Sequence, residues 1–134
     1  MALPDSTAER AQLGAKVRRE VLGAVHVDSG KQQANAFTQH FIDFTQTQCW
    51  GYVWLREGLS RKTRSMLNLA MLSATARWHE FEVHVRGALN NGVTPEEIAE
   101  ILLQAGVYAG IPVAAEGFRR ANDVINKVAA ENTR

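Results

Sequence analysis

Apolar residues recur at spacings of three and four along most of the chain, which is the spacing of one face of a helix. No segment shows a sustained alternation of apolar and polar residues, the pattern of a half-buried strand. Six helices are predicted: up to about residue 22, over residues 32–53, from residue 61 after Ser60, over residues 76–90, from Pro95, and from Pro112 to about residue 128. The chain is therefore predicted to be all-α.

Local capping signals support several of these boundaries. Asp5 or Ser6 can cap the first helix, and Thr94 is followed by Pro95 and by Glu97, the arrangement of a capping box. Residues 23–30 are predicted to be a loop, and a break is expected between Gly110 and Pro112. The helix after Ser60 is apolar on most sides, so it is expected at the centre of the fold. We expect one domain over residues 1–134, with its core at about 9–128.

Composition narrows the class of protein. The chain has 134 residues, 46% of them apolar and 22% charged, which is ordinary for a folded globular domain. A single cysteine, Cys49, excludes an intrachain disulfide and a Cys-x-x-Cys redox pair, and is expected to be a buried apolar residue. The first 20 residues lack the apolar run of a signal peptide, and residues 101–118 contain too many polar residues, glycines and Pro112 to span a membrane. A small, soluble, cytoplasmic protein is expected.

The net charge of +1 hides an uneven distribution. Residues 1–55 hold five basic and five acidic groups, residues 56–86 hold six basic and three acidic groups, and residues 87–134 hold four basic and six acidic groups. The overall balance gives no field that would attract nucleic acid. The positive middle of the chain is instead where a site for a small anion is expected.

One candidate constellation lies in this stretch. Arg77, Glu80 and His84 are spaced by three and four residues, which places them on one stripe of a helix. Glu80 could accept a hydrogen bond from His84 and raise its pKa, producing a proton donor near neutral pH, while Arg77 could hold a carboxylate. An exposed ladder of salt bridges is the alternative. His79 and His84 are five residues apart, about 140° around a helix, so no zinc site is predicted.

A second constellation precedes it. Trp50 and Trp54 are four residues apart and could form an aromatic wall, and Arg56 stands where the helix gives way to a glycine-containing loop. An arginine beside aromatic rings is a suitable carboxylate receptor. The alternative is that the two tryptophans pack in the core or against another subunit. Three cations in one first helical turn oppose the helix dipole and need a negative partner nearby: Arg61, Lys62 and Arg64.

Several segments together resemble the 4-carboxymuconolactone decarboxylase family. They are, in chain order, Arg18-Arg19-Glu20-Val21-Leu22-Gly23, Trp50-Gly51-x-x-Trp54-x-Arg56-x-Gly58-Leu59, Thr63-Arg64-Ser65, Glu80-x-x-x-His84-x-Arg86, Asn90-Asn91-Gly92-Val93-Thr94 and Tyr108-x-Gly110-x-Pro112. The resemblance implies the alkylhydroperoxidase-D-like helical fold, assembled as homotrimers or homohexamers. The small residues within 104–115 suit close helix packing between such chains.

The resemblance also implies a reaction, the decarboxylation of a small lactone dicarboxylate in protocatechuate catabolism (the β-ketoadipate pathway). The substrate delocalises its own electrons onto the lactone carbonyl, so no metal or organic cofactor is expected. Arg56 and Arg64 would hold carboxylates, beside the wall formed by Trp50 and Trp54. His84, poised by Glu80, would donate a proton or bind the lactone oxygen, and Arg77 would be a second anchor or stabilise the oxyanion.

Two alternatives to the decarboxylase function remain open, and so does the identity of the substrate. Peroxidases of the same superfamily carry Cys-x-x-Cys-x-x-x-His, and alignment on His84 places Arg77 and Glu80 where those cysteines stand. The chain could also be a non-catalytic oligomer that binds a small acid. Relatives often carry an acid at Tyr52, a proline at Glu57 and an arginine-bearing stretch at residues 47–49, which leaves a related lactone or keto acid open as the substrate.

Overall fold

A computed structural model describes residues 2–133, and within that range all regular secondary structure is helical. Seven α-helices, one π-helix and one 3-10 helix follow one another, and no strand occurs among the described residues. The predicted all-α class is confirmed. The chain divides into two compact units, Met1–Ser60 and Arg61–Arg134, which are described separately.

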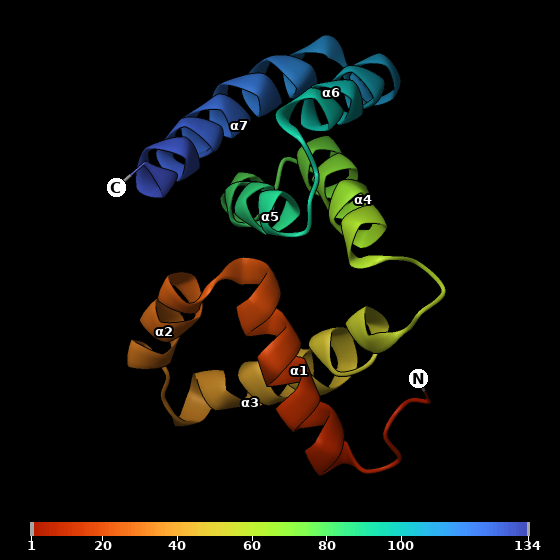
Figure 1. The fold of residues 1–134 in the computed structure, drawn as a ribbon, viewed down its shortest axis with the longest axis vertical. Coiled ribbons are helices and arrows are strands. Elements are labelled where there is room, and N and C mark those ends of the chain that lie inside the picture. Colours follow the sequence, from red (N-terminus) through yellow and green to blue (C-terminus); the bar gives the residue numbers. More distant parts are fainter. Residues whose placement is uncertain (1, 134) are drawn as a thin grey trace. The chain divides into compact units, whose positions relative to one another are not determined.

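The first unit contains α1 (Thr7–Leu22), α2 (Ala24–Gln32), α3 (Ala36–Phe44), the π-helix η1 (Thr45–Trp50) and the 3-10 helix η2 (Val53–Leu55) (Figure 1). The predicted cap of the first helix is confirmed, because the side chain of Ser6 accepts a hydrogen bond of 3.1 Å from the backbone N–H of Glu9. Asn35 and Thr38 cap α3 reciprocally, which stops any helix from running through residue 35.

Two sequence predictions in this unit are wrong. Residues 23–30 are not a loop, because Gly23, with a φ of 92°, ends α1 and the chain re-enters a helix at Ala24. Residues 32–53 are not one helix either. The hydroxyls of Thr45 and Thr47 donate to the carbonyls of Ile42 and Asp43, at 3.0 and 2.8 Å. Such side-chain bonds compete with the regular ladder, and the helix widens into η1 here.

Helix α1 meets η1 through two glycines. A Cβ added at Gly14 would lie 2.1 Å from the carbonyl oxygen of Gln46, and one added at Gly51 would lie 2.3 Å from the carbonyl oxygen of Arg10. Both neighbours are backbone atoms, so they cannot rotate out of the way. The absence of a side chain at these two positions is therefore what lets the two backbones pack against each other.

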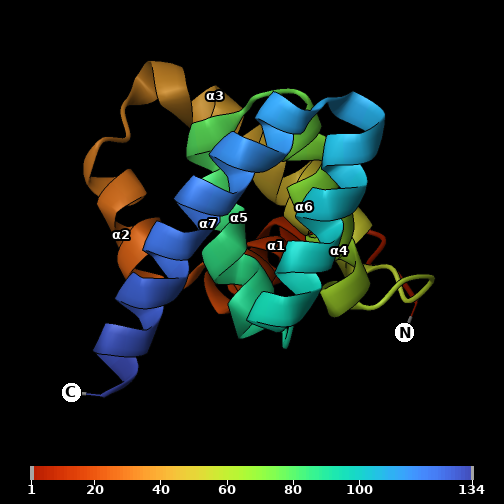
Figure 2. The same cartoon turned by 90° about the horizontal axis from the view of Figure 1, so that it is seen from above.

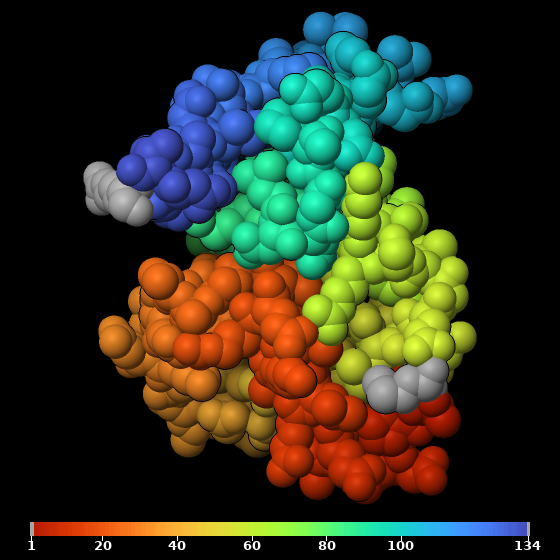
Figure 3. Space-filling model, viewed as in Figure 1, coloured from red at the N-terminus to blue at the C-terminus, as the bar shows by residue number. Residues whose placement is uncertain are grey.

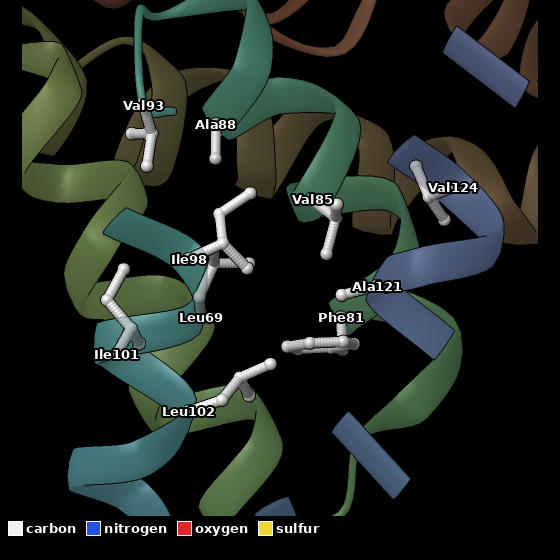
Figure 4. Packing of buried hydrophobic residues seen from close by; sticks show 10 residues of the cluster. All are labelled: Leu69, Phe81, Val85, Ala88, Val93, Ile98, Ile101, Leu102, Ala121 and Val124. Atoms are coloured by element: carbon white, nitrogen blue, oxygen red, sulfur yellow. The ribbon is translucent and has the colours of Figure 1, made fainter. Parts of the chain in front are cut away.

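The second unit contains α4 (Arg61–Ala74), α5 (Trp78–Asn90), α6 (Pro95–Ala109) and α7 (Ile111–Asn132). Helix α4 packs against α5 and α6, and α7 packs against α5 and α6 (Figure 2). Figure 4 shows the apolar side chains that meet between them, among which Leu69, Phe81 and Val85 are fully buried. Removing a ring such as that of Phe81 from a core of this kind costs about 3–5 kcal/mol.

The helix boundaries of the second unit largely follow the predictions. Thr94 and Glu97 form the predicted capping box, with both hydrogen bonds at 3.1 Å. Gly110, with a φ of 119°, separates α6 from α7 as expected, although α7 begins at Ile111 and continues to Asn132. Helix α5 begins at Trp78, two residues later than predicted, because the backbone of Ala76 is left-handed, with a φ of 55°.

Helix α4 is less central than its composition suggested. Ser65, Leu69 and Ser73 are buried and define one face, whereas Leu67 and Met71 on the other side are exposed. The phenylalanine stripe of α3 is exposed too, with Phe37 85% accessible. Among the described residues, no helix has both the length and the apolar character needed to cross a membrane.

The glycine contact in the first unit can be tested directly. We expect Gly14→Ala to lower the free energy of unfolding by about 2 kcal/mol, because its methyl group would overlap backbone atoms of η1. Helix propensity alone would make the alanine variant more stable by about 1 kcal/mol, so a measured loss of stability cannot come from propensity and reports the steric overlap. Denaturant unfolding measures the change. Gly58→Ala, where an added Cβ meets nothing within 4 Å, is the control, and equal stabilities of the two variants would contradict the prediction.

Candidate active site

The sequence-predicted site residues fall in both units. Trp50, Trp54 and Arg56 belong to the first unit. The second unit contains the other four: Arg64, Arg77, Glu80 and His84. Within each unit, the structure shows which of these side chains lie together.

Trp50 and Trp54 form a stacked pair. Their ring centroids are 4.9 Å apart with an interplanar angle of 25°, and the residues are 5% and 6% exposed. Burial raises the pKa of the neighbouring Cys49 thiol, although a hydrogen bond with Trp54 opposes the shift. Burial of both rings favours the alternative in which the pair is interior packing over the predicted open wall.

Arg56 follows η2 in extended backbone and is exposed. Its guanidinium lies 5.5 Å from the centre of the Tyr52 ring, and Nη1 is 3.5 Å from the Tyr52 hydroxyl. The guanidinium of Arg10, from α1, lies 5.6 Å from the centre of the same ring. Tyr52 therefore brings two cations together through cation–π contacts. Sequence reasoning missed Arg10, since it lies 42 positions before Tyr52 and no motif links them.

The cations in the first turn of α4 have the expected kind of neighbour. Lys62 Nζ lies 3.1 Å from Glu97 Oε1, which comes from α6. The pKa of Glu97 is lowered by the backbone N–H of Thr94 and by Lys62. The predicted acidic partner is therefore confirmed for Lys62. Arg64 is half-buried in the same turn, with its Nε atom inside the protein.

His84 lies in the middle of α5 and faces α4. Its Nδ1 atom is 3.4 Å from Nδ2 of Asn68, in partly buried surroundings. An amide N–H that donates to Nδ1 leaves the ring proton on Nε2, which makes Nε2–H the donor toward other groups. Asn68 was not predicted, because it stands 16 residues away on another helix. Its one sequence signal is a polar residue inside the apolar run of residues 66–72.

Arg77 and Glu80 do not join His84 as predicted. Arg77 precedes α5 with non-helical backbone, φ −88° and ψ 69°, so the helical stripe does not extend back to it. Glu80 lies in the first turn and is exposed, and it forms no hydrogen bond or ion pair with any described residue. The predicted hydrogen bond between Glu80 and His84 is therefore absent, and the neutral amide of Asn68 contacts the ring.

No three histidine, cysteine or carboxylate side chains within residues 2–133 come close enough to bind a metal ion. The second unit brings together the imidazole of His84 and the amide of Asn68, and the first turn of α4 carries cations in the same unit. This set can bind an anion and move a proton.

Comparison with known proteins assigns the chain to a family. Residues 39–123 match the profile of the carboxymuconolactone decarboxylase family. This match covers more than half of the chain. The chain belongs to the carboxymuconolactone decarboxylase family. The match begins in the first unit and ends in the second, and it includes His84, Asn68 and Arg56.

Three individual proteins are similar to this chain. A 4-carboxymuconolactone decarboxylase from Acinetobacter baylyi is 40% identical over 116 residues, which cover 87% of each chain. A nitrosuccinic acid decarboxylase from Metarhizium robertsii is 41% identical over 118 residues, covering 85% of this chain and 82% of the relative. An uncharacterized protein of 15.0 kDa from Paracoccus denitrificans is 30% identical over 115 residues, covering 73% and 86%.

The Asn68–His84 contact predicts a change in the pKa of His84. Asn68→Asp places a carboxylate beside Nδ1, which favours the imidazolium, and we expect the pKa of His84 to rise by about 1 unit or more. NMR titration of the ring protons measures the value. Asn126→Asp, on the exposed side of α7, is the matched control and leaves the pKa of His84 where it is in the parent protein. A pKa that Asn68→Asp does not raise would show that the two side chains are not in contact.

Proposed function

We propose that the protein is a cofactor-independent carbon–carbon lyase that removes one carboxylate from a small dicarboxylate, with 4-carboxymuconolactone as its substrate. The proposal is supported by 40% identity to a 4-carboxymuconolactone decarboxylase over 87% of both chains. The observation that carries the mechanism is the contact between His84 and Asn68, which supplies an oriented imidazole inside the family-matched segment.

The two decarboxylases named above point to one chemical requirement. 4-Carboxymuconolactone and nitrosuccinate each carry two carboxylates and one electron-withdrawing group, a conjugated lactone carbonyl or a nitro group. When the carbon–carboxylate bond breaks, carbon dioxide leaves and the electron pair moves into that group. A proton then adds to carbon. The substrate is its own electron sink, so the protein has to hold the remaining carboxylate, stabilise the developing negative charge and deliver the proton.

The described side chains can meet these needs. Arg56, held against Tyr52, and Arg64, in the first turn of α4, are proposed to bind the carboxylates. The Nε2–H of the neutral His84 ring is proposed to bind the developing oxyanion, or the imidazolium form to donate the proton, in which case Asn68 would turn its amide oxygen toward Nδ1–H. Neutral Asn68 stabilises an imidazolium less than a carboxylate would. The imidazolium of His84 is therefore a stronger acid beside Asn68 than it would be beside a carboxylate such as Glu80. Exposed Glu80 and Arg77 remain candidates for contacts to the substrate.

Self-association is part of the proposal. Val107 and Tyr108, near the end of α6, are 77% and 82% exposed, and Ile111 follows them at the start of α7. Figure 3 shows the light-blue residues of this α6–α7 turn at the surface. Large apolar side chains that are exposed close together in the chain are characteristic of an interface, and a second copy of the chain is the proposed partner. We further propose that residues 1–134 act as one domain, since the family match crosses both units. The proposed location of the protein is the cytoplasm.

The peroxidase alternative has less support. Cys49 is the single cysteine of the chain, and the raised pKa of its thiol disfavours the reactive thiolate. Arg77 and Glu80 occupy the positions where the resemblance places the two cysteines. A thiol peroxidase cycle that resolves through an intrachain disulfide needs a second cysteine.

Turnover of 4-carboxymuconolactone, followed by its ultraviolet absorbance, tests the proposed activity. We expect His84→Gln to lower kcat by about 100-fold or more, the usual contribution of a positioned proton donor. His40→Gln, on the exposed surface of α3, is the control and retains the activity of the parent protein. Full activity of a folded His84→Gln variant would exclude the mechanism, and no turnover by the parent protein would favour a non-catalytic binder. Nitrosuccinate is the comparison substrate, and its faster turnover would reassign the substrate.

The role of Arg56 makes a different kinetic prediction. We expect Arg56→Gln to raise KM by about 10-fold or more while kcat changes less, since a carboxylate anchor binds the ground state as well as the transition state. Lys127→Gln on α7 removes the same charge from an exposed position and is the control. If Arg56→Gln lowers kcat and leaves KM unchanged, Arg56 acts on the transition state and is not an anchor.

A further inference from the structure

The first unit contains a cavity that shares no residue with the candidate active site. Its volume is about 380 Å³, within the range of pockets that hold small organic molecules. It is lined by residues of α1, α2, α3, the segment between α2 and α3, and the start of η1. The groups that matter for binding are two cations, two carboxamides and two apolar side chains: Arg18, Lys31, Gln33, Gln46, Phe41 and Ile42.

The charge of the lining has one sign. Arg18 and Lys31 both face the cavity, and none of its described lining residues carries a carboxylate. Two carboxylates on neighbouring segments, Asp28 and Asp43, accept hydrogen bonds from other residues of the same unit. Asp28 accepts both guanidinium hydrogen bonds of Arg19, at 2.6 and 3.2 Å, and Asp43 accepts a bond of 2.8 Å from the side chain of Gln39. Two cations therefore face one space whose own lining supplies no countercharge, and Asp28, which interacts electrostatically with Lys31, already accepts both guanidinium hydrogen bonds of Arg19.

Arg18 is the central group of this cavity. Its side chain is half-buried and reaches from α1 to α2, where Nη2 lies 3.9 Å from the position that a Cβ of Gly30 would occupy. It forms no hydrogen bond or ion pair with any residue in the described part of the chain. Burial lowers the pKa of Arg18, which reports the loss of solvation around its charge. A partly desolvated guanidinium is stabilised when an anion binds to it.

The remaining lining residues indicate which kind of anion fits. The side-chain amides of Gln33 and Gln46 form no hydrogen bonds with described residues, so their N–H groups can donate to a ligand. Phe41 and Ile42 add apolar surface beside the cations. Inorganic phosphate would leave that surface uncovered. An organic acid can place its carboxylate on the guanidinium fork and its hydrocarbon part on the apolar side.

We propose that this cavity is a binding site for a small organic carboxylate, held by Arg18 and Lys31 through its charge and by Phe41 and Ile42 through its apolar body. The site shares no residue with the candidate active site and does not depend on the proposed function. An acid bound here stabilises the folded first unit, since a ligand that binds only the folded state raises its stability.

Benzoate is the probe, because it joins one carboxylate to one apolar ring, and benzamide is its neutral counterpart. Titration of the full-length protein, followed by amide chemical shifts, should move the signals of Thr38 and Gln46 with benzoate and not with benzamide. Inorganic phosphate should bind at least several-fold more weakly. Shifts confined to other residues, or equal binding of benzamide or phosphate, would overturn the proposal.

Three variants test the assigned cations. Arg18→Gln is expected to weaken benzoate binding by about 10-fold or more, and Lys31→Gln by a smaller factor, since Lys31 is more exposed. Lys16→Gln removes the same charge from the exposed side of α1 and is the control. Arg18→Lys keeps the charge without the guanidinium fork, and it provides the test if Arg18→Gln does not fold. Unchanged benzoate affinity in the folded Arg18 variant would refute the assignment, whatever the protein does with 4-carboxymuconolactone.

Discussion

The packing of α4 against α5 is the interaction on which the candidate catalytic pair depends. Leu69 on α4 and Phe81 and Val85 on α5 are fully buried in the shared core of the second unit. Asn68 is next to Leu69 in the chain, and His84 is next to Val85. The apolar contacts therefore set the distance and rotation of the two helices, and these bring the amide to 3.4 Å from the imidazole. A looser core would leave both polar residues in place on their helices and separate them from each other.

The first unit depends on a different constraint, the close approach of α1 and η1 at Gly14 and Gly51. This contact brings Arg10, near the start of α1, to the ring of Tyr52 just after η1. It also holds Arg18, two turns further along α1, beside the cavity that Gln46 of η1 lines. The backbone contact thus positions two arginines of α1, Arg10 at the Tyr52 ring and Arg18 at the cavity. Each is suited to an anion for the same electrostatic reason.

The identity of the residue beside His84 changes the chemistry of the candidate site. A carboxylate partner would stabilise the imidazolium and make it a weaker acid, whereas an amide orients the ring without adding charge. The family assignment places two decarboxylases of different small acids among the relatives of this chain. In the proposed mechanism the substrate is its own electron sink, so a proton donor and carboxylate anchors are the groups that the protein has to supply.

The sequence alone determined the family and several features that arise within a few residues of each other, although the local helix boundaries at Gly23, Asn35 and Thr45 were missed. The capping box of Thr94 and Glu97, the cap at Ser6 and the break at Gly110 depend on local hydrogen bonds and backbone angles, and all were predicted. Tertiary structure decided the partner of His84, since Glu80 stands at a suitable spacing and Asn68, 16 residues away, makes the contact. It also placed Arg10 at Tyr52 and Arg18 at a cavity. Contacts between distant segments depend on how helices pack, and residue spacing contains no record of that packing.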